Sequence, residues 1–324
     1  MLQSYISIMH KIWKQVALIV FGIILISVVV YIFATGRATF VSIFPSVKNS
    51  SMQNSATSKS IFSIEHIFII MDENKAASSI IGNSQAPYIN NLITKYGIAT
   101  NYSAITHPSL PNYLAITSGS TDGITTDCNP PLAGCVVNVN NIATQVQASG
   151  RSWKEYAQSM PSACYIQNSG SYATKHNPFI YYQSIIGNAN LCDADVVPYA
   201  QLKSDLKSVS STPNFAFITP NLCDDMHNCS IATGDTWLAN NVPMILNSPA
   251  FRAQPSLLII TWDEGDAASN VVATIFAGSA ARHQYQSNSR FNHYSILHTI
   301  EYVWGLKALT PNVENAPLMT NFID

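Results

Sequence analysis

Three apolar runs most constrain this fold, because each of them leads into acidic or amide residues. The runs cover residues 67–71, 215–219 and 258–262. The first run leads into Asp72-Glu73-Asn74-Lys75 and the third into Asp263-Glu264-Gly265-Asp266. The second leads into Pro220-Asn221, with Asp224 and Asp225 a few residues later. Uninterrupted apolar runs are typical of parallel strands buried on both faces, whose carboxyl ends share one edge of the sheet. The sequence therefore predicts an acidic rim at one sheet edge, in a chain with only 18 acidic residues.

Strand-like and helix-like segments alternate over most of the chain. Residues 64–71, 214–219, 257–262 and 271–277 have the pattern of buried strands, whereas 87–96, 235–246 and 293–304 have helical spacing. This alternation predicts one α/β domain with a central, mostly parallel sheet and helices on both faces. Residues between Cys128 and Pro213 are less regular, and we expect them to form loops over one end of the sheet.

The N-terminal part predicts a membrane anchor followed by a linker. Residues 16–34 contain no charged side chain and are long enough to span a bilayer, after a short segment 1–15 expected to be cytoplasmic. A cleaved signal sequence is the alternative, and the protein would then be secreted. Residues 35–63 are rich in Ser, Thr and Asn and are expected to form a flexible tether, which leaves 64–324 as the catalytic domain.

The six cysteines favour an extracytoplasmic location for that domain. They fall into three local pairs, Cys128/Cys135, Cys164/Cys192 and Cys223/Cys229, which predict three disulfides formed in an oxidising compartment. A zinc site is the alternative, but the chain has no Cys-x-x-Cys motif. The net charge of −2 gives no electrostatic reason to expect a nucleic-acid partner.

Ser109 is the candidate nucleophile. It lies between Pro108 and Pro111 at a predicted loop-to-helix junction, where backbone N–H groups and the helix dipole favour an anion. The simpler interpretation is that Ser109 is only the helix N-cap. His107, two residues earlier, is a candidate substrate-binding residue or an ordinary structural histidine.

The acidic rim offers a candidate metal site beside this serine. Glu73, Asn74, Asp263 and Glu264 would supply oxygen ligands, which suit one divalent hard cation such as Ca²⁺, Mg²⁺ or Mn²⁺. Each pair could instead cap the helix that follows its strand. His176 and His293 lie in polar, turn-like settings, where a histidine could donate a proton or hold a phosphate.

Several motifs occur in an order that resembles a known family. They are residues 72–75, 106–113, 176–179 (His-Asn-Pro-Phe), 261–266 and 292–301. Together they resemble the phosphoesterase family of bacterial acid phosphatases and non-haemolytic phospholipases C, within the alkaline-phosphatase-like superfamily. The resemblance implies that Ser109 becomes phosphorylated, that Asn112 contacts the substrate, and that His176 and His293 lie near the phosphate. It also implies that Glu73 and Asn74, together with Asp263 and Glu264, bind the metal.

The sequence departs from the phospholipases, because Gly265-Asp266-Ala267-Ala268 follows Glu264 and no long C-terminal extension is present. These departures favour the smaller, phosphatase-like members of the family. Together with the candidate metal site, the cysteines and the resemblance, they lead to the hypothesis of a metal-dependent, extracytoplasmic phosphomonoesterase of the acid-phosphatase type, acting on a small phosphate ester through a phosphoserine intermediate. A phospholipase C-like phosphodiesterase and a non-catalytic surface binding domain are the alternatives. A metal-independent Ser-His-Asp esterase is disfavoured, because no Gly-x-Ser-x-Gly motif surrounds Ser109.

Overall fold

The computed structural model describes residues 63–131, 134–265 and 270–324. The expected cytoplasmic segment 1–15, the expected anchor 16–34 and all of the expected tether except Ser63 lie outside these ranges. Among the described residues, no helix is sufficiently long and apolar to cross a bilayer.

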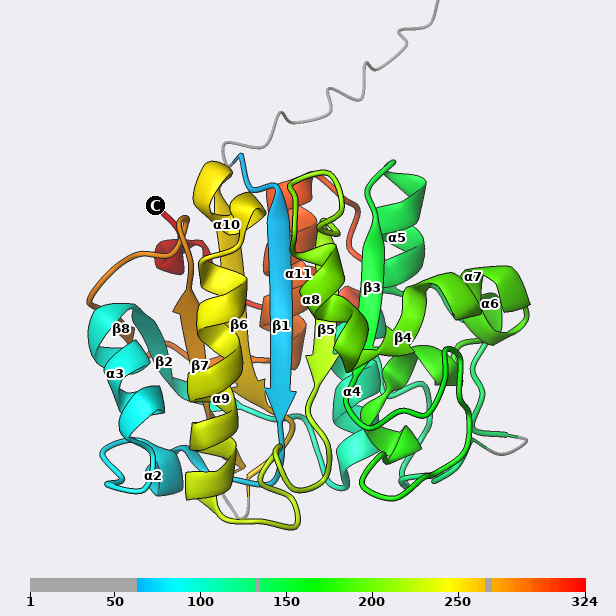
Figure 1. Cartoon of the computed structure of the whole chain (residues 1–324), viewed down its shortest axis with the longest axis horizontal. Coiled ribbons are helices and arrows are strands. Elements are labelled where there is room, and N and C mark those ends of the chain that lie inside the picture. The colour runs from blue at the N-terminus through cyan, green and yellow to red at the C-terminus, as the bar shows by residue number, and fades with distance from the viewer. Residues whose placement is uncertain (1–62, 132–133, 266–269) are drawn as a thin grey trace, which may run out of the picture. The chain divides into compact units, whose positions relative to one another are not determined.

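One mixed sheet forms the centre of the fold (Figure 1), with the strand order β4-β3-β5-β1-β6-β7-β2-β8 and with β9 paired to β2. Neighbouring strands are parallel except where β7 pairs with β6 and β2. The predicted mostly parallel α/β sheet is therefore confirmed. The strands are β1 (His66–Asp72), β2 (Gly97–Ser103), β3 (Trp153–Ala157), β4 (Val196–Pro198), β5 (Phe215–Thr219), β6 (Ser256–Trp262), β7 (Val271–Ala277), β8 (Tyr285–Ser287) and β9 (Phe291–Asn292).

Helices cover both faces of the sheet, as expected: α3, α9 and α10 lie on the side facing the viewer in Figure 1, and α4 and α11 lie on the other. The α-helices are α2 (Ala77–Ile80), α3 (Pro87–Lys95), α4 (Ser109–Ser118), α5 (Ile142–Ala148), α6 (Gln183–Ile186), α7 (Ala189–Asp195), α8 (Leu202–Asp205), α9 (Ile231–Leu246), α10 (Pro249–Ala253), α11 (His293–Trp304) and α12 (Pro311–Glu314). Short 3₁₀ helices are η1 (Thr174–His176), η2 (Pro178–Tyr181), η3 (Tyr199–Gln201) and η4 (Thr320–Phe322).

The prediction of loops between Cys128 and Pro213 was wrong in part. This region contributes β3 and β4, which extend the sheet beyond β5. The apolar pattern of β3 is interrupted by Lys154 and Glu155, and the Glu155 side chain is nevertheless buried, where it accepts a hydrogen bond from Thr219. Buried strands are predicted from runs of apolar residues, and a glutamate within the run interrupts that pattern, so this strand was not predicted.

The topology brings the ends of four strands to one edge. β1, β5 and β6 run parallel to one another, and β2 runs in the same direction because two antiparallel pairings separate it from β6. The segment after β2 leads into α4, whose ten residues are all buried and which packs against α11. Ser109, the first residue of α4, is thus placed at the edge that also holds the residues following β1, β5 and β6.

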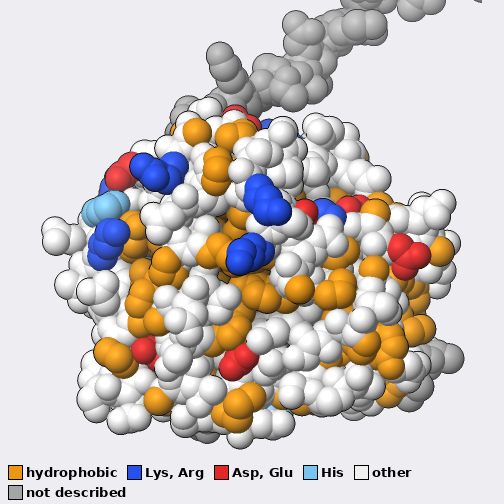
Figure 2. Space-filling view, viewed as in Figure 1, with side chains coloured by type: hydrophobic (Ala, Val, Ile, Leu, Met, Phe, Trp, Pro, Cys, Tyr) orange, Lys and Arg blue, Asp and Glu red, His pale blue; other side chains and the backbone are white. Residues whose placement is uncertain are grey.

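The three predicted disulfides, Cys128–Cys135, Cys164–Cys192 and Cys223–Cys229, are all present, and they account for every cysteine of the chain. The surface is poor in charge, as the charged fraction of 10% requires. Figure 2 shows on one face of the molecule a mainly uncharged polar surface with scattered lysine, arginine and acidic side chains.

Glu301 gives the fold a testable dependence on pH. It lies on α11, where its buried carboxyl group accepts a hydrogen bond from the Leu309 N–H and faces the Gln145 side chain. Burial raises the pKa of Glu301 to about 8. As the pH rises from the ordinary pKa of a glutamate towards this value, the unfolded chain loses the proton while the folded chain keeps it. The free energy of unfolding should therefore fall over this interval.

We expect Glu301→Gln to remove this loss, because glutamine does not titrate. The variant should be more stable than the wild type at slightly alkaline pH, by on the order of 1–3 kcal/mol after discounting for solvent screening, and similar to it near pH ~4.5. Thermal unfolding at both pH values measures the difference, with Glu314→Gln as a control at an exposed acid. Equal stabilities at alkaline pH would contradict the prediction.

Candidate active site

Glu73 is the centre of the site. It follows β1 directly and its side chain is fully buried. Its Oε2 accepts hydrogen bonds of 3.1 Å from the Ser109 hydroxyl and of 3.1 Å from the Asn74 amide, and its Oε1 accepts one from the Tyr113 hydroxyl. The His176 Nε2 lies 3.2 Å from the same Oε1. A single carboxylate thus joins β1 to α4 and to η1.

Ser109 does not act as the helix N-cap. The N-cap position of α4 is Pro108, which has no side chain able to cap, and the Ser109 hydroxyl donates instead to Glu73. Ser109 is the first helical residue and is 1% exposed. The Ser109 hydroxyl is therefore held by a carboxylate at the start of a helix.

Asp263 lies beside Glu73 with an unsatisfied oxygen. Its Oδ1 accepts a 3.0 Å hydrogen bond from the backbone N–H of Asn74, whose φ of 53° lies in the left-handed region. Its Oδ2 is buried and has no hydrogen-bond partner among the described residues. Burial first, and then the charges of Glu73 and Glu264, raise the pKa of Asp263 well above its usual value. A cation between the carboxylates of Glu73 and Asp263 would remove this cost.

Glu264, predicted to bind the metal, and Asn112, predicted to contact the substrate, contact other protein groups in this structure. The Glu264 Oε2 lies 2.9 Å from the Nδ1 of His107 and 3.4 Å from the Nδ2 of Asn112. The Asn112 side chain also accepts hydrogen bonds from the N–H groups of Ile105 and Thr106 and donates to the Thr106 and Pro108 carbonyls. This network fixes the segment that precedes Ser109. The geometry therefore suits a positioning residue better than a substrate ligand.

His293 lies behind Asp263 and makes no contact with Ser109 that we observe. Its Nδ1 is 2.9 Å from the Tyr102 hydroxyl and its Nε2 is 2.7 Å from the backbone carbonyl of Asp263. Burial lowers the pKa of His293 to about 4, so the ring is neutral above that pH and donates from Nε2 to the carbonyl. Both nitrogens are occupied, and this arrangement suits support of Asp263 better than proton donation to a substrate.

His176 lies between two buried carboxylates. Its Nε2 faces Glu73, its Nδ1 is 3.1 Å from Asp225 Oδ2, and its ring stacks on that of Tyr113 with centroids 5.5 Å apart. Burial alone would lower the pKa of His176, but Glu73 and Asp225 outweigh it and raise the pKa to about 9. The ring is therefore a cation at neutral pH. In turn, the charge of His176 lowers the pKa of Glu73 below its usual value, against the effect of burial.

Sequence analysis assigned no role to several residues that the structure brings to this site, although Asp225 and His227 were noted as part of a polar segment after a strand. These residues are Tyr113, Lys175, Asp225, His227 and, from the loop after α4, Asp127. Tyr113 carried a usable signal, because it lies four residues after Ser109 and therefore on the same helix face. Lys175 directly precedes His176, and Asp225 and His227 follow β5. No motif or spacing around Asp127 in the sequence indicates that it belongs to the site, because only its contacts in the folded structure bring it there.

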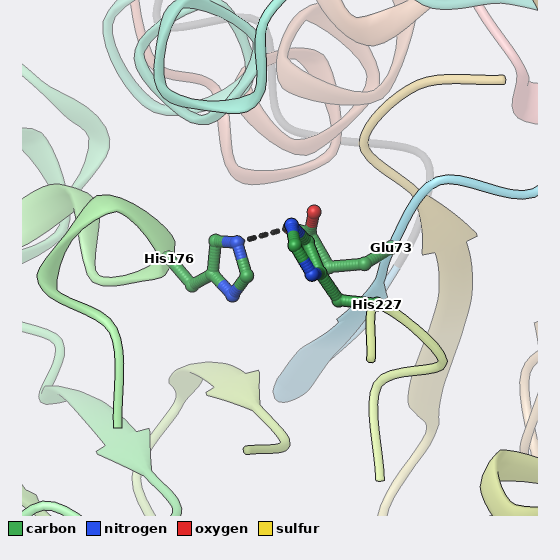
Figure 3. Close-up of side chains that lie close together, drawn as sticks. All are labelled: Glu73, His176 and His227. Atoms are coloured by element: carbon green, nitrogen blue, oxygen red, sulfur yellow. Dashed lines mark ion pairs between the residues drawn. The ribbon is translucent and has the colours of Figure 1, made fainter. Parts of the chain in front are cut away.

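Two groups of residues could hold a divalent metal, and both include Glu73. The first combines Glu73 with His176 and His227, which place one ligand atom each within 4.8 Å of one another (Figure 3). The second is the oxygen-rich set of Glu73, Asn74 and Asp263. The orphaned and buried Oδ2 of Asp263 shows that the second set fits a cation.

Comparisons with a family model, with curated proteins and with solved structures all point to phosphatases or to their fold. The model of the Phosphoesterase family matches residues 81–307. A phosphatidylinositol-3-phosphatase of Mycobacterium tuberculosis is 32% identical over 79% of this chain and 82% of its own length. A phosphate-repressible acid phosphatase of Penicillium chrysogenum is 32% identical over 67% of this chain, which spans about half (54%) of that longer protein. A solved alkaline phosphatase superfamily protein of Vibrio parahaemolyticus shares the fold, with a TM-score of 0.56 and 12% identity over 78% of this chain and 69% of its own.

Proposed function

The chain belongs to the Phosphoesterase family and is a hydrolase of phosphoric esters, and we propose that it is a metal-dependent phosphomonoesterase with Ser109 as its nucleophile. The observation that carries this proposal is the hydrogen bond from Ser109 to the buried Glu73, next to the unsatisfied carboxylate of Asp263. A serine at the start of a helix, beside a site for a cation, has what phosphoryl transfer needs.

We assign the metal to the oxygen-rich set rather than to the histidines. Both ring nitrogens of His176 already face carboxylates, Glu73 on one side and Asp225 on the other, so neither nitrogen points to an open position. The Nε2 of His227 lies 3.3 Å from the ammonium of Lys175, which disfavours a second cation there. In the oxygen-rich set, the Oδ2 of Asp263 has no hydrogen-bond partner among the described residues and is open to a metal, and Glu264 would join this set only by giving up its contact with His107.

The protein's own groups have distinct roles in the proposed reaction. A bound metal would supply charge neutralisation at the phosphoryl group. Glu73 orients the Ser109 hydroxyl and accepts its hydrogen bond, and the Oγ attacks phosphorus as the bond to the leaving alcohol breaks. Water then hydrolyses the phosphoserine and releases phosphate. His176 holds Glu73 in place and adds positive charge beside it, and His293 holds the backbone of Asp263.

The disulfides support an extracytoplasmic location, because such bonds persist in oxidising compartments. The predicted N-terminal anchor or signal sequence is consistent with this location. We propose that the domain acts outside the cytoplasm, attached to the membrane through residues 16–34 or released from it.

A substrate panel tests the function. The full-length, metal-loaded protein is assayed across acidic and neutral pH with p-nitrophenyl phosphate, bis-p-nitrophenyl phosphate and phosphatidylcholine. Phosphatidylinositol 3-phosphate is included because of the mycobacterial relative's name. We expect the highest kcat/KM with a monoester. A higher value with a diester would favour the phospholipase C-like alternative, and no turnover by a correctly folded, metal-loaded protein would favour a binding domain.

A further inference from the structure

A partly buried ion pair lies next to the nucleophile, and the proposed reaction assigns it no role. The Lys175 ammonium donates a 3.0 Å hydrogen bond to Asp127 Oδ2 and lies 3.3 Å from the Nε2 of His227. The other oxygen of Asp127 accepts a 3.3 Å hydrogen bond from the backbone N–H of Leu110, the residue after Ser109. The Asp127 carboxylate therefore bridges the lysine and the start of α4.

The two members of this pair differ in how freely they can move. The Lys175 side chain is 11% exposed, whereas that of Asp127 is 31% exposed and comes from a loop. The other carboxylates around the site, those of Glu73, Asp225 and Asp263, are buried. Asp127 is thus the acid nearest to solvent, and turning outward would let water hydrate its charge. Loss of Asp127 would leave the buried ammonium without its hydrogen-bonded anion, which favours another anion in the same place.

We propose that Asp127 is a place-holder for the substrate, and that a phosphoryl group displaces it from Lys175 and from the Leu110 N–H. This inference rests on the proposed function, because it identifies where the non-bridging oxygens of the monoester lie. A carboxylate and a phosphate present the same kind of acceptor oxygens to an ammonium and a backbone N–H. Ser109 is 1% exposed, and the proposal requires that the departure of the carboxylate opens a path to its hydroxyl. Lys175 is then the specificity residue for the charge of the monoester.

The proposed replacement of Asp127 by a phosphoryl group gives a reason for an ion pair of Lys175 and Asp127 so close to Ser109. Burial alone would lower the pKa of Lys175, but the charges of Glu73 and Asp127 outweigh it and raise the pKa above its usual value. Free enzyme and bound enzyme each keep one anion on Lys175. The affinity for phosphate is then set by competition with Asp127, which weakens the binding of product as well as that of substrate.

Binding of inorganic phosphate to the full-length, metal-loaded protein tests the proposal by calorimetry, with the KM for p-nitrophenyl phosphate as a second readout. Asp127→Asn should lower both the phosphate Kd and the KM by about tenfold, because the competing charge is lost. Lys175→Gln should raise the Kd by about tenfold or more. In the double variant, the gain from Asp127→Asn should largely disappear, because the two side chains act on one anion.

Asp122→Asn is the matched control, since it makes the same change in the same loop, where the carboxylate accepts from the Ser118 hydroxyl at the far end of α4. It should leave both constants unchanged. A Kd that rises or stays constant in a correctly folded Asp127→Asn variant would overturn the place-holder role, even if the protein is an active phosphatase. Tighter phosphate binding by a variant without turnover would instead keep this inference and reject the proposed catalysis.

Discussion

Ser109→Ala is expected to lower phosphate release from p-nitrophenyl phosphate by on the order of 10³-fold or more. Alanine removes the oxygen that attacks phosphorus, and the described contacts of Ser109 offer no second hydroxyl in its place. The tyrosine that also donates to Glu73, Tyr113, is held in a separate hydrogen bond to the other carboxyl oxygen. The rate loss should appear in kcat, with bound metal and the thermal unfolding temperature nearly unchanged.

Two further measurements separate the loss of a nucleophile from the loss of structure. Mass spectrometry of the acid-quenched wild-type enzyme should find a phosphoryl group on the peptide that contains Ser109, and this signal should be absent from the variant. Ser118→Ala is the control, because Ser118 is a buried serine at the other end of the same helix. Substantial activity in a folded Ser109→Ala variant would reject the phosphoserine mechanism.

Glu73→Gln should have an effect nearly as large, on the order of 10²-fold or more in kcat, together with a loss of bound divalent metal. Glutamine keeps the size of the side chain but removes the charge that holds the Ser109 hydroxyl, His176 and the proposed cation. Metal analysis of the purified variant measures the second effect directly. Treatment of the wild type with a chelator should reproduce the loss of activity, and added metal should restore it in the wild type.

Glu155→Gln is the matched control for this experiment, because Glu155 is also a fully buried acid of the sheet but contacts Thr219 rather than the site. It should retain metal and activity. A Glu73→Gln variant that loses activity and keeps its full metal content would move the metal away from Glu73. It would still agree with a role for the carboxylate in orienting Ser109.

Local patterns in the sequence predicted the elements of the fold well. The helix over 293–304 and the strand over 271–277 have the predicted bounds, and the helix predicted over 87–96 ends one residue earlier. These segments have clear apolar periodicity and, for α11, a capping Asn292. β2 and β3 escaped prediction because polar residues such as Asn101 and Glu155 interrupt their apolar patterns.

The sequence also predicted which polar residues gather at the sheet edge, but it did not predict their partners. Ser109, Glu73 and Asp263 were expected together, because residues that follow parallel strands share an edge. The place of His293 near the phosphate stays a prediction; the structure adds that its ring contacts Tyr102 and the backbone of Asp263, which depends on how α11 packs on the sheet. The Asn112 side chain was expected to contact the substrate, and in the structure it forms hydrogen bonds with the backbone of the segment before Ser109.

The sequence by itself thus determined the α/β architecture, the three cysteine pairs, the serine at a helix start and the acids at the strand ends. Each of these depends on residues that are close in the chain or on the rule that parallel strands end at one edge. Only the tertiary structure decided that Ser109 donates to Glu73 instead of capping its helix, and that Asp127 bridges Lys175 and Leu110. Such contacts join segments far apart in sequence, and their geometry depends on strand order and side-chain direction, which no local pattern specifies.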